Sequence, residues 1–221
     1  GQFCNGLDLF LEKHEGLMGL ALASSDPGAT HAAWQAAGLA TAEFRPLRRL
    51  LEGKSGDLEV AFENVMLDRG ETAGLSLFAC HHLTPEKLRQ PGWTRHPVTA
   101  TRLNSVTTLV RDPEAMAERL EAIFGRSAIT RTDEVIAAHA GHTVMLFARV
   151  EDAVMLHPAF DLEADDDTPL LTVLEIAVRD IDEARRFLDL QGVEYGSEPD
   201  GSLTIQPDDA FGVAIELTPE G

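Results

Sequence analysis

The chain has 221 residues, and its 18 Lys plus Arg against 37 Asp plus Glu give a formal net charge of -19. A surface of that sign repels phosphate backbones and anionic lipids, so neither nucleic acid nor a membrane is an expected partner. No apolar run approaches the roughly 20 residues that span a bilayer. The only two cysteines, Cys4 and Cys80, are too few for a disulfide framework. These features predict a cytoplasmic protein of one or two domains.

Three segments, taken in chain order, share one pattern. An apolar stretch runs into an acidic residue, and a stretch of helical periodicity then ends at a glycine. The segments are LMGLALASSDPGATHAAWQAAGL from Leu17, VTTLVRDPEAMAERLEAIFG from Val106 and TVLEIAVRDIDEARRFLDLQGV from Thr172. Asp is a favoured helix N-cap and Gly a favoured residue just past the helix end. The caps are predicted at Asp26, Asp112 and Asp180, and the stops at Gly38, Gly125 and Gly192. Each segment is therefore predicted to be a strand followed by a helix.

Strand-like stretches follow each predicted helix. Their apolar and polar residues alternate, and turn sequences such as SGD, AG and EPDG separate them, which is typical of antiparallel strands with one polar face. The stretches are 42–51, 57–67 and 74–82, then 127–140 and 142–150, then 202–207 and 212–219. The fold class predicted is α+β, with a helix over a small, mostly antiparallel sheet in each repeat.

This βαβββ unit resembles the module of the vicinal oxygen chelate superfamily, which includes glyoxalase I, extradiol dioxygenases and bleomycin-resistance proteins. The order EGLMGLAL, FACHHLTPEKLRQPGWTRHP and VTTLVRDPEAM more narrowly resembles the bacterial glyoxalase-like domain proteins. The resemblance implies that modules pair into curled mixed sheets enclosing a cup. A ferredoxin-like ligand sensor is an alternative that would lack the extra strands after each helix.

Because the resemblance implies pairs, three modules are one short of two pairs. We expect that residues 1–97 form the second half of an N-terminal glyoxalase-like domain plus a linker, with a first module missing before Gly1. Residues 98–221 would form a complete domain of two modules, about 98–160 and 170–221, joined by the acidic stretch DLEADDDTP. Alternatively, another subunit supplies the missing partner; a homodimer is expected by analogy with the family.

Enzymes of the superfamily place a divalent metal such as Mn, Fe, Ni or Zn in the cup. The resemblance implies a His near the start of strand one, about seven residues before each capping Asp. This chain has Gly19, Ser105 and Val173 there, and none of these is a strong ligand. The C-terminal pair is therefore predicted to be metal-free.

The family also has a Glu near the end of strand four. Glu216 in GVAIELTP matches it, which makes Glu216 a candidate metal ligand, although an outward-facing Glu is the commoner event on a strand. In the preceding module, the corresponding residues are expected to be Met145 and Phe147.

The stretch CHHLTPEKLRQPGWTRHP, from Cys80 to Pro97, contains three of the eight histidines. Adjacent strand residues point to opposite faces, so at most one of His81 and His82 enters a cup. The resemblance favours His82 as the inward residue. We therefore predict His82, Trp93 and His96 as ligand-pocket residues and His82 as a candidate metal ligand. A hydrogen-bonded structural role for each His, and packing for Trp93, are the alternatives.

The other histidines carry weaker signals. His139 and His142 flank Gly141 in AAHAGHTV, which indicates a turn between strands, and His157 is expected in an exposed loop.

The resemblance implies a protein that binds a small organic molecule in a sheet-lined cup. Metal-dependent lyase, isomerase or dioxygenase chemistry is one option, and metal-free small-molecule binding of the bleomycin-resistance type is the alternative. The substrate and the catalytic residues are not determined by the sequence.

Overall fold

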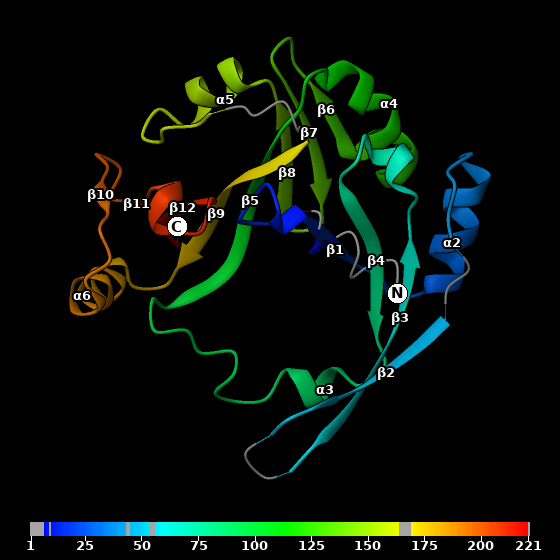
Figure 1. The fold of residues 1–221 in the computed structure, drawn as a ribbon, viewed down its shortest axis with the longest axis horizontal. Coiled ribbons are helices and arrows are strands. Elements are labelled where there is room, and N and C mark those ends of the chain that lie inside the picture. The colour runs from blue at the N-terminus through cyan, green and yellow to red at the C-terminus, as the bar shows by residue number, and fades with distance from the viewer. Residues whose placement is uncertain (1–6, 9, 43–44, 54–55, 164–168, 221) are drawn as a thin grey trace. The chain divides into compact units, whose positions relative to one another are not determined.

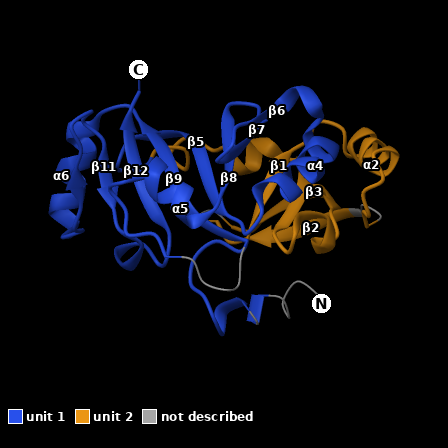
Figure 2. Cartoon of the chain, turned by 90° about the horizontal axis from the view of Figure 1, so that it is seen from above, with its two compact units in different colours: residues 1–18, 96–221 blue, residues 19–95 orange. Residues whose placement is uncertain are grey.

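A computed structural model of the chain describes residues 7–8, 10–42, 45–53, 56–163 and 169–220. The chain divides into two compact units (Figure 2). The smaller unit is residues 19–95, and the larger unit combines residues 1–18 with residues 96–221. Figure 1 shows the helices and strands of both units with their labels.

The smaller unit contains one βαβββ module. Its main elements are β1 (Gly19–Ala23), α2 (Pro27–Ala36), β2 (Arg45–Leu51), β3 (Leu58–Met66) and β4 (Ser76–His82), followed by the short α3 (Pro85–Leu88). The strands form a four-stranded sheet of order β1-β4-β3-β2, in which β1 and β4 are parallel and the other neighbours are antiparallel.

The larger unit contains two further modules. The elements of the first are β5 (Ala100–Leu109), α4 (Pro113–Phe124), β6 (Ile129–Arg131), β7 (Val135–Ala140) and β8 (Thr143–Ala148). The elements of the second are β9 (Leu170–Val178), α6 (Ile181–Gln191), β10 (Gly196–Ser197), β11 (Leu203–Ile205) and β12 (Ala214–Pro219). In both, the first strand again pairs in parallel with the last strand. The predicted α+β fold of repeated βαβββ modules is thus confirmed.

The two modules of the larger unit join through their first strands. β5 and β9 pair antiparallel and complete an eight-stranded mixed sheet of order β10-β11-β12-β9-β5-β8-β7-β6. The pairing places the middle of each first strand at the centre of the sheet. Side chains there on the face away from the helices are therefore positioned by two modules at once.

The predicted helix caps are confirmed. The carboxylates of Asp26, Asp112 and Asp180 accept hydrogen bonds of 2.9, 3.1 and 2.9 Å from the backbone N–H three residues later. At the end of α6, Gly192 adopts φ 68° and ψ 28°, the left-handed conformation that glycine reaches without a Cβ clash.

The apolar stripes of the helices pack on one face of the sheet. Met116, Leu120 and Ile123 of α4 are buried, and α4 contacts β7 and β8. Ala184 and Leu188 of α6 belong to a buried cluster with residues of β9, β11 and β12. Helices α4 and α6 therefore cover one face of the sheet, and a different set of side chains lies on the opposite face.

Two elements were not predicted. Helix α5 (Val150–Leu156) follows β8 directly, and the two-residue strand β10 precedes the Asp200–Gly201 turn. The acidic linker was predicted at 161–169; its residues 164–168 lie outside the described residues, as does Cys4. Across the described residues, no helix is both long and apolar enough to cross a membrane. The domain boundaries and the pairing of the smaller unit with a further module stay predictions.

The cap of α4 can be tested by substitution. Replacing Asp112 with Ala removes the acceptor for the Ala115 N–H, and we expect the free energy of unfolding to fall by about 1 kcal/mol. Asp112→Asn keeps a hydrogen-bond acceptor, so its free energy of unfolding should fall by only a few tenths of that amount. Urea unfolding followed by circular dichroism measures both variants, and an equal loss in the two would contradict a capping role.

Candidate functional site

The face of the eight-stranded sheet opposite the helices, here called the cup face, carries a polar row across the module boundary. Glu216 of β12 lies beside Glu175 of β9, Glu175 beside Ser105 of β5, and Ser105 beside Val144 of β8. Residues paired across neighbouring strands point to the same face, so these side chains share one surface. A carboxylate at the centre of a sheet needs hydrogen-bond partners, and the neighbouring strand supplies them.

A β-bulge in β5 supplies two hydrogen-bond donors for the Glu175 carboxylate, where a regular strand would supply one. In the β5–β9 register, Leu103 faces Ile176 and Ser105 faces Glu175, which leaves Asn104 as an extra residue. A bulge bends the strand and redirects side chains. Here it lets the consecutive residues Asn104 and Ser105 reach the same carboxylate.

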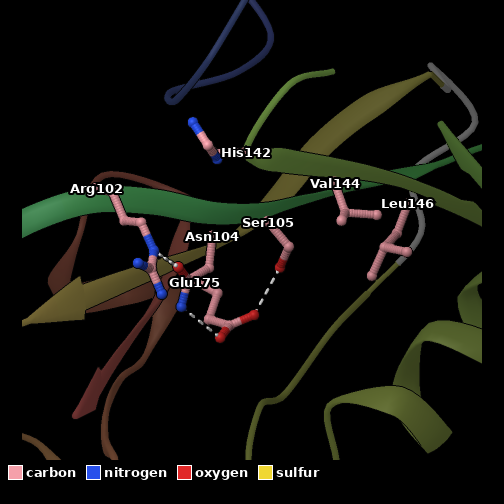
Figure 3. A pocket seen from close by; sticks show the side chains of 7 residues that line it. All are labelled: Arg102, Asn104, Ser105, His142, Val144, Leu146 and Glu175. Atoms are coloured by element: carbon pink, nitrogen blue, oxygen red, sulfur yellow. Dashed lines mark hydrogen bonds between the residues drawn. The ribbon is translucent and has the colours of Figure 1, made fainter. Parts of the chain in front are cut away.

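The Glu175 carboxylate is fixed at both oxygens (Figure 3). Ser105 Oγ donates a hydrogen bond of 2.9 Å to Oε2, and Asn104 Nδ2 donates one of 3.0 Å to Oε1. Thr218 Oγ1 adds a longer contact of 3.4 Å to Oε1. Asn104 Oδ1 in turn accepts a hydrogen bond of 2.7 Å from Arg102 Nε. The result is a chain from guanidinium through amide to carboxylate.

These groups line a pocket of about 630 Å³ on the cup face. Its lining residues are Arg102, Asn104, Ser105, His142, Val144, Leu146 and Glu175 (Figure 3). Val144 and Leu146 of β8 form the apolar part of the pocket lining. Residues of β5 and β9 form its polar part. His142 lies at the turn between β7 and β8, as predicted for the AAHAGHTV stretch.

The other end of the cup face is filled by apolar side chains from the connection between the modules. Ala153 of α5, Phe160 and Leu162 pack with a buried cluster that includes Leu109 and Val173. This packing closes the cup face at one end of the strands. The pocket described above lies at the other end, which holds Glu175.

His157 lies in the loop after α5, as expected, but it is half-buried on the cup face, so the expected exposure was wrong. Its Nε2 lies 2.8 Å from the hydroxyl oxygen of the fully buried Thr107. Burial lowers the pKa of His157, and the nearby Glu175 carboxylate partly opposes that shift. The imidazole is therefore neutral at physiological pH and shares a hydrogen bond with Thr107.

Glu216, predicted as a candidate metal ligand, lies beside Glu175 in the polar row. Burial raises its pKa, and the neighbouring Glu175 charge raises it further, while a hydrogen bond from Ser202 Oγ of 3.3 Å opposes the shift. The role of Glu216 as a metal ligand stays a prediction.

The position that corresponds to Glu216 in the preceding module was predicted one residue out of register. Met145 and Phe147 are both buried on the helix-covered side, whereas Leu146 faces the pocket. The β5–β8 and β9–β12 registers make Leu146 the counterpart of Glu216. A slip of one residue exchanges the two faces of a strand, which explains the error.

The strand-one positions also differ from one another. Ser105 faces the pocket and binds Glu175, whereas Val173 lies in the apolar cluster at the closed end. Gly19 in β1 lies opposite Ser76, and a Cβ at Gly19 would meet the Ser76 backbone. No side chain therefore fits at Gly19 without a shift of β4.

In the smaller unit, the two neighbouring histidines of β4 point to opposite faces. His81 Nδ1 lies 2.8 Å from the Ser24 carbonyl oxygen. His82 lies on the other face, 3.8 Å from Cys80 Sγ and edge-on to Phe62. His82 is exposed, and burial raises the pKa of the Cys80 thiol.

The remaining predicted pocket residues lie after α3. Trp93 is 50% exposed, and His96 is exposed, with its Nδ1 3.3 Å from the Val98 N–H. Trp93 belongs to the smaller unit and His96 to the larger one. Ligand binding by His82, Trp93 and His96 stays a prediction.

The key residue that sequence reasoning missed is Glu175. It lies two residues after Val173, the position compared with the family His, in the otherwise apolar strand LLTVLEIAV. A single charge inside an apolar strand was the available signal. Its partners could not be identified in the same way, because the β5 bulge has no marker in the sequence.

The pocket can be tested against the requirements of a metal centre. Mn, Fe, Ni and Zn sites use imidazole, thiolate or several carboxylates. The hydrogen-bond partners of Glu175 are an amide and hydroxyls, and the ligand types nearby are one carboxylate, Glu216, and one imidazole, His142. Within the described part of the chain, no three His, Cys, Asp or Glu side chains are placed to hold a metal ion. The donor set around Glu175 therefore does not fit such a centre.

The family model of the glyoxalase-like domain matches residues 5–124, which is more than half of the chain. The chain belongs to the glyoxalase-like domain family. This membership, together with the paired βαβββ modules, confirms the predicted vicinal oxygen chelate superfamily. No curated protein matches this glyoxalase-like protein.

Solved structures share the fold of the glyoxalase-like protein at low sequence identity. A hypothetical protein from Staphylococcus aureus matches with a TM-score of 0.62 and 10% identity, over 96% of this chain and 70% of that one. The 2,3-dioxygenase LapB from Pseudomonas sp. KL28 matches with a TM-score of 0.57 and 13% identity, over 93% and 72%. The Mn(II)-bound glyoxalase from Novosphingobium aromaticivorans matches with a TM-score of 0.52 and 14% identity, over 92% and 62%. This chain thus spans less than two thirds of that glyoxalase.

The raised pKa of Glu216 predicts a pH-dependent stability difference. A carboxyl with a higher pKa in the folded state destabilises the fold when ionised, and this cost disappears once the group is protonated in both states. We therefore expect Glu216→Gln to raise the melting temperature at pH 7 to 8, with the gain vanishing as the pH falls to about 4.5.

The exposed Glu194 provides the matched control. Glu194→Gln should leave the melting temperature nearly unchanged across the same pH range. Differential scanning calorimetry measures both variants, and a loss of stability in Glu216→Gln at pH 7 would show that the ionised carboxylate is favourably held.

Proposed function

We propose that this glyoxalase-like protein binds a small organic molecule in the pocket on the cup face of the larger unit. The observation that carries the proposal is the Glu175 carboxylate, which is held at both oxygens and lines an open pocket. A volume of about 630 Å³ lies within the range of small-molecule sites.

The composition of the pocket supports the same proposal. One wall is apolar, with Val144 and Leu146, and the other presents an ordered chain of polar groups. Small-molecule sites typically combine apolar walls with a few fixed polar groups.

Metal-free binding is favoured for this pocket because its lining offers one carboxylate, Glu175, and one imidazole, His142, beside an amide, a hydroxyl and the Arg102 guanidinium. Of the two options that the family resemblance implies, the sequestering type therefore fits the larger unit better than metal-assisted catalysis. The low-identity structural neighbours include a Mn(II)-bound glyoxalase and a 2,3-dioxygenase, so a metal-dependent lyase, isomerase or dioxygenase activity is the alternative. That alternative would have to draw on one of the predicted ligands, His82 or Glu216, and on further ligands.

Ligand binding can be tested by blocking the pocket. Val144→Trp places a bulky side chain on its apolar wall, whereas Val154→Trp changes a residue of α5 that is 41% exposed. We expect compounds detected by ligand-observed NMR with the unmodified protein to lose at least tenfold in affinity with Val144→Trp. Affinity with Val154→Trp should remain within twofold. Equal binding to all three proteins would place the site elsewhere.

Metal content separates the two functional options. We expect purified protein to contain far less than one equivalent of Mn, Fe, Ni or Zn by mass spectrometry, and its melting temperature to be insensitive to chelator. A near-stoichiometric metal that His82→Ala removes, with a loss of thermal stability, would overturn metal-free binding and support the predicted His82 site. A metal that Glu216→Gln removes would instead support the predicted Glu216 ligand.

A further inference from the structure

The polar wall of the pocket holds two opposite charges that do not pair with each other. Asn104 lies between them, accepting from Arg102 Nε at 2.7 Å and donating to Glu175 Oε1 at 3.0 Å. Among the described residues, no carboxylate forms an ion pair with the Arg102 guanidinium. The Asn104 amide therefore lies between the guanidinium and the carboxylate and forms a hydrogen bond with each of them.

Each charge keeps unused hydrogen-bonding capacity. A guanidinium has five N–H donors, and only Nε–H of Arg102 is engaged, which leaves its two terminal amino groups available. A carboxylate has about four acceptor positions. Glu175 uses two on Oε1, for Asn104 and Thr218, and one on Oε2, for Ser105. One acceptor position on Oε2 is therefore free.

The free donors of Arg102 and the free acceptor position of Glu175 would bind different chemical groups. The terminal amino groups of Arg102 suit a planar carboxylate, which can accept two parallel hydrogen bonds. The free position on Glu175 requires a donor, such as a hydroxyl or an ammonium group. A dianionic phosphate is disfavoured, because Glu175 and Glu216 lie side by side in the same polar row.

The spacing of the charged groups constrains the ligand further. The oxygen and nitrogen of the Asn104 amide, on one carbon atom, are enough to connect Arg102 with Glu175. By analogy with this amide, a ligand that carries its acceptor and its donor on neighbouring carbons would contact the terminal amino groups of Arg102 and Oε2 of Glu175. Val144 and Leu146 on the neighbouring strand β8 would contact an apolar substituent.

We propose that the pocket recognises a small carboxylic acid with a hydroxyl or amino group on the adjacent carbon and an apolar side chain. The inference rests on the proposed function, since it names the ligand class of the same pocket. Arg102 binds the carboxylate, Glu175 accepts from the hydroxyl or amino group, and Asn104 holds the two at the required separation. Ser105 is a positioning residue, because its hydroxyl fixes Glu175 Oε2.

Four probes with the same branched apolar end test this assignment. They are 2-hydroxy-4-methylpentanoate, leucine, 4-methylpentanoate and 3-methylbutan-1-ol. The first two carry both groups, the third lacks the donor, and the fourth lacks the carboxylate. We expect the 2-hydroxy acid or the amino acid to bind at least tenfold more tightly than the other two probes, by NMR titration. The better of the two distinguishes a hydroxyl from an ammonium donor.

Two substitutions assign the contacts. Arg102→Gln should remove the advantage of acids over the alcohol, and Glu175→Gln should remove the advantage of donor-bearing acids over 4-methylpentanoate. Arg102 is exposed, so its replacement does not threaten the fold. Arg126, whose side chain is 90% exposed outside the pocket, supplies the control Arg126→Gln, which should retain both preferences.

The outcomes separate this inference from the proposed function. If the alcohol binds as tightly as the acids, or if Arg102→Gln leaves the acid preference intact, the ligand class is wrong while the pocket still binds small molecules. If no probe binds, and a broader set of neutral and cationic fragments also gives no signal sensitive to Val144→Trp, the proposed function fails as well.

Discussion

The larger unit is organised around a charged side chain at the centre of its sheet. Glu175 lies on β9, the strand through which the second module pairs with the first. Removing a carboxylate from water is costly unless it accepts hydrogen bonds, so the antiparallel β5–β9 pairing must deliver donors at this position. The β5 bulge does so by directing both Asn104 and Ser105 toward the carboxylate. The site therefore exists only where two modules meet.

The rest of the cup face surrounds Glu175 with apolar packing at one end and further charged groups at the other. Apolar side chains from α5 and the segment after it fill one end, with His157 held neutral against Thr107, and leave the Glu175 end open. Glu216 extends the negative row onto β12 and Arg102 supplies a positive group on β5. A carboxylate held by neutral donors, with a separate guanidinium beside it, supports the proposed binding of a polar organic molecule.

Sequence patterns predicted the repeated part of the fold because its signals are local. The capping carboxylates of Asp26, Asp112 and Asp180 and the helical stripes act within a few residues, so the three modules and the family resemblance could be predicted from the order of residues alone. The register of β8 could not, since Met145 and Leu146 are both apolar and only pairing decides which one faces the pocket. Helix α5 also lacked a capping signal, and its N-cap residue Arg149 makes no side-chain capping hydrogen bond.

The sequence by itself determined the modules, their order and the presence of an isolated Glu in an apolar strand. Only the tertiary structure decided that this Glu meets Asn104 and Ser105, residues about seventy positions earlier in the chain. The physical reason is that propensity and capping depend on neighbours along the chain. A bulge and the partners of a carboxylate depend on the register between two distant strands, which the packing of whole modules sets.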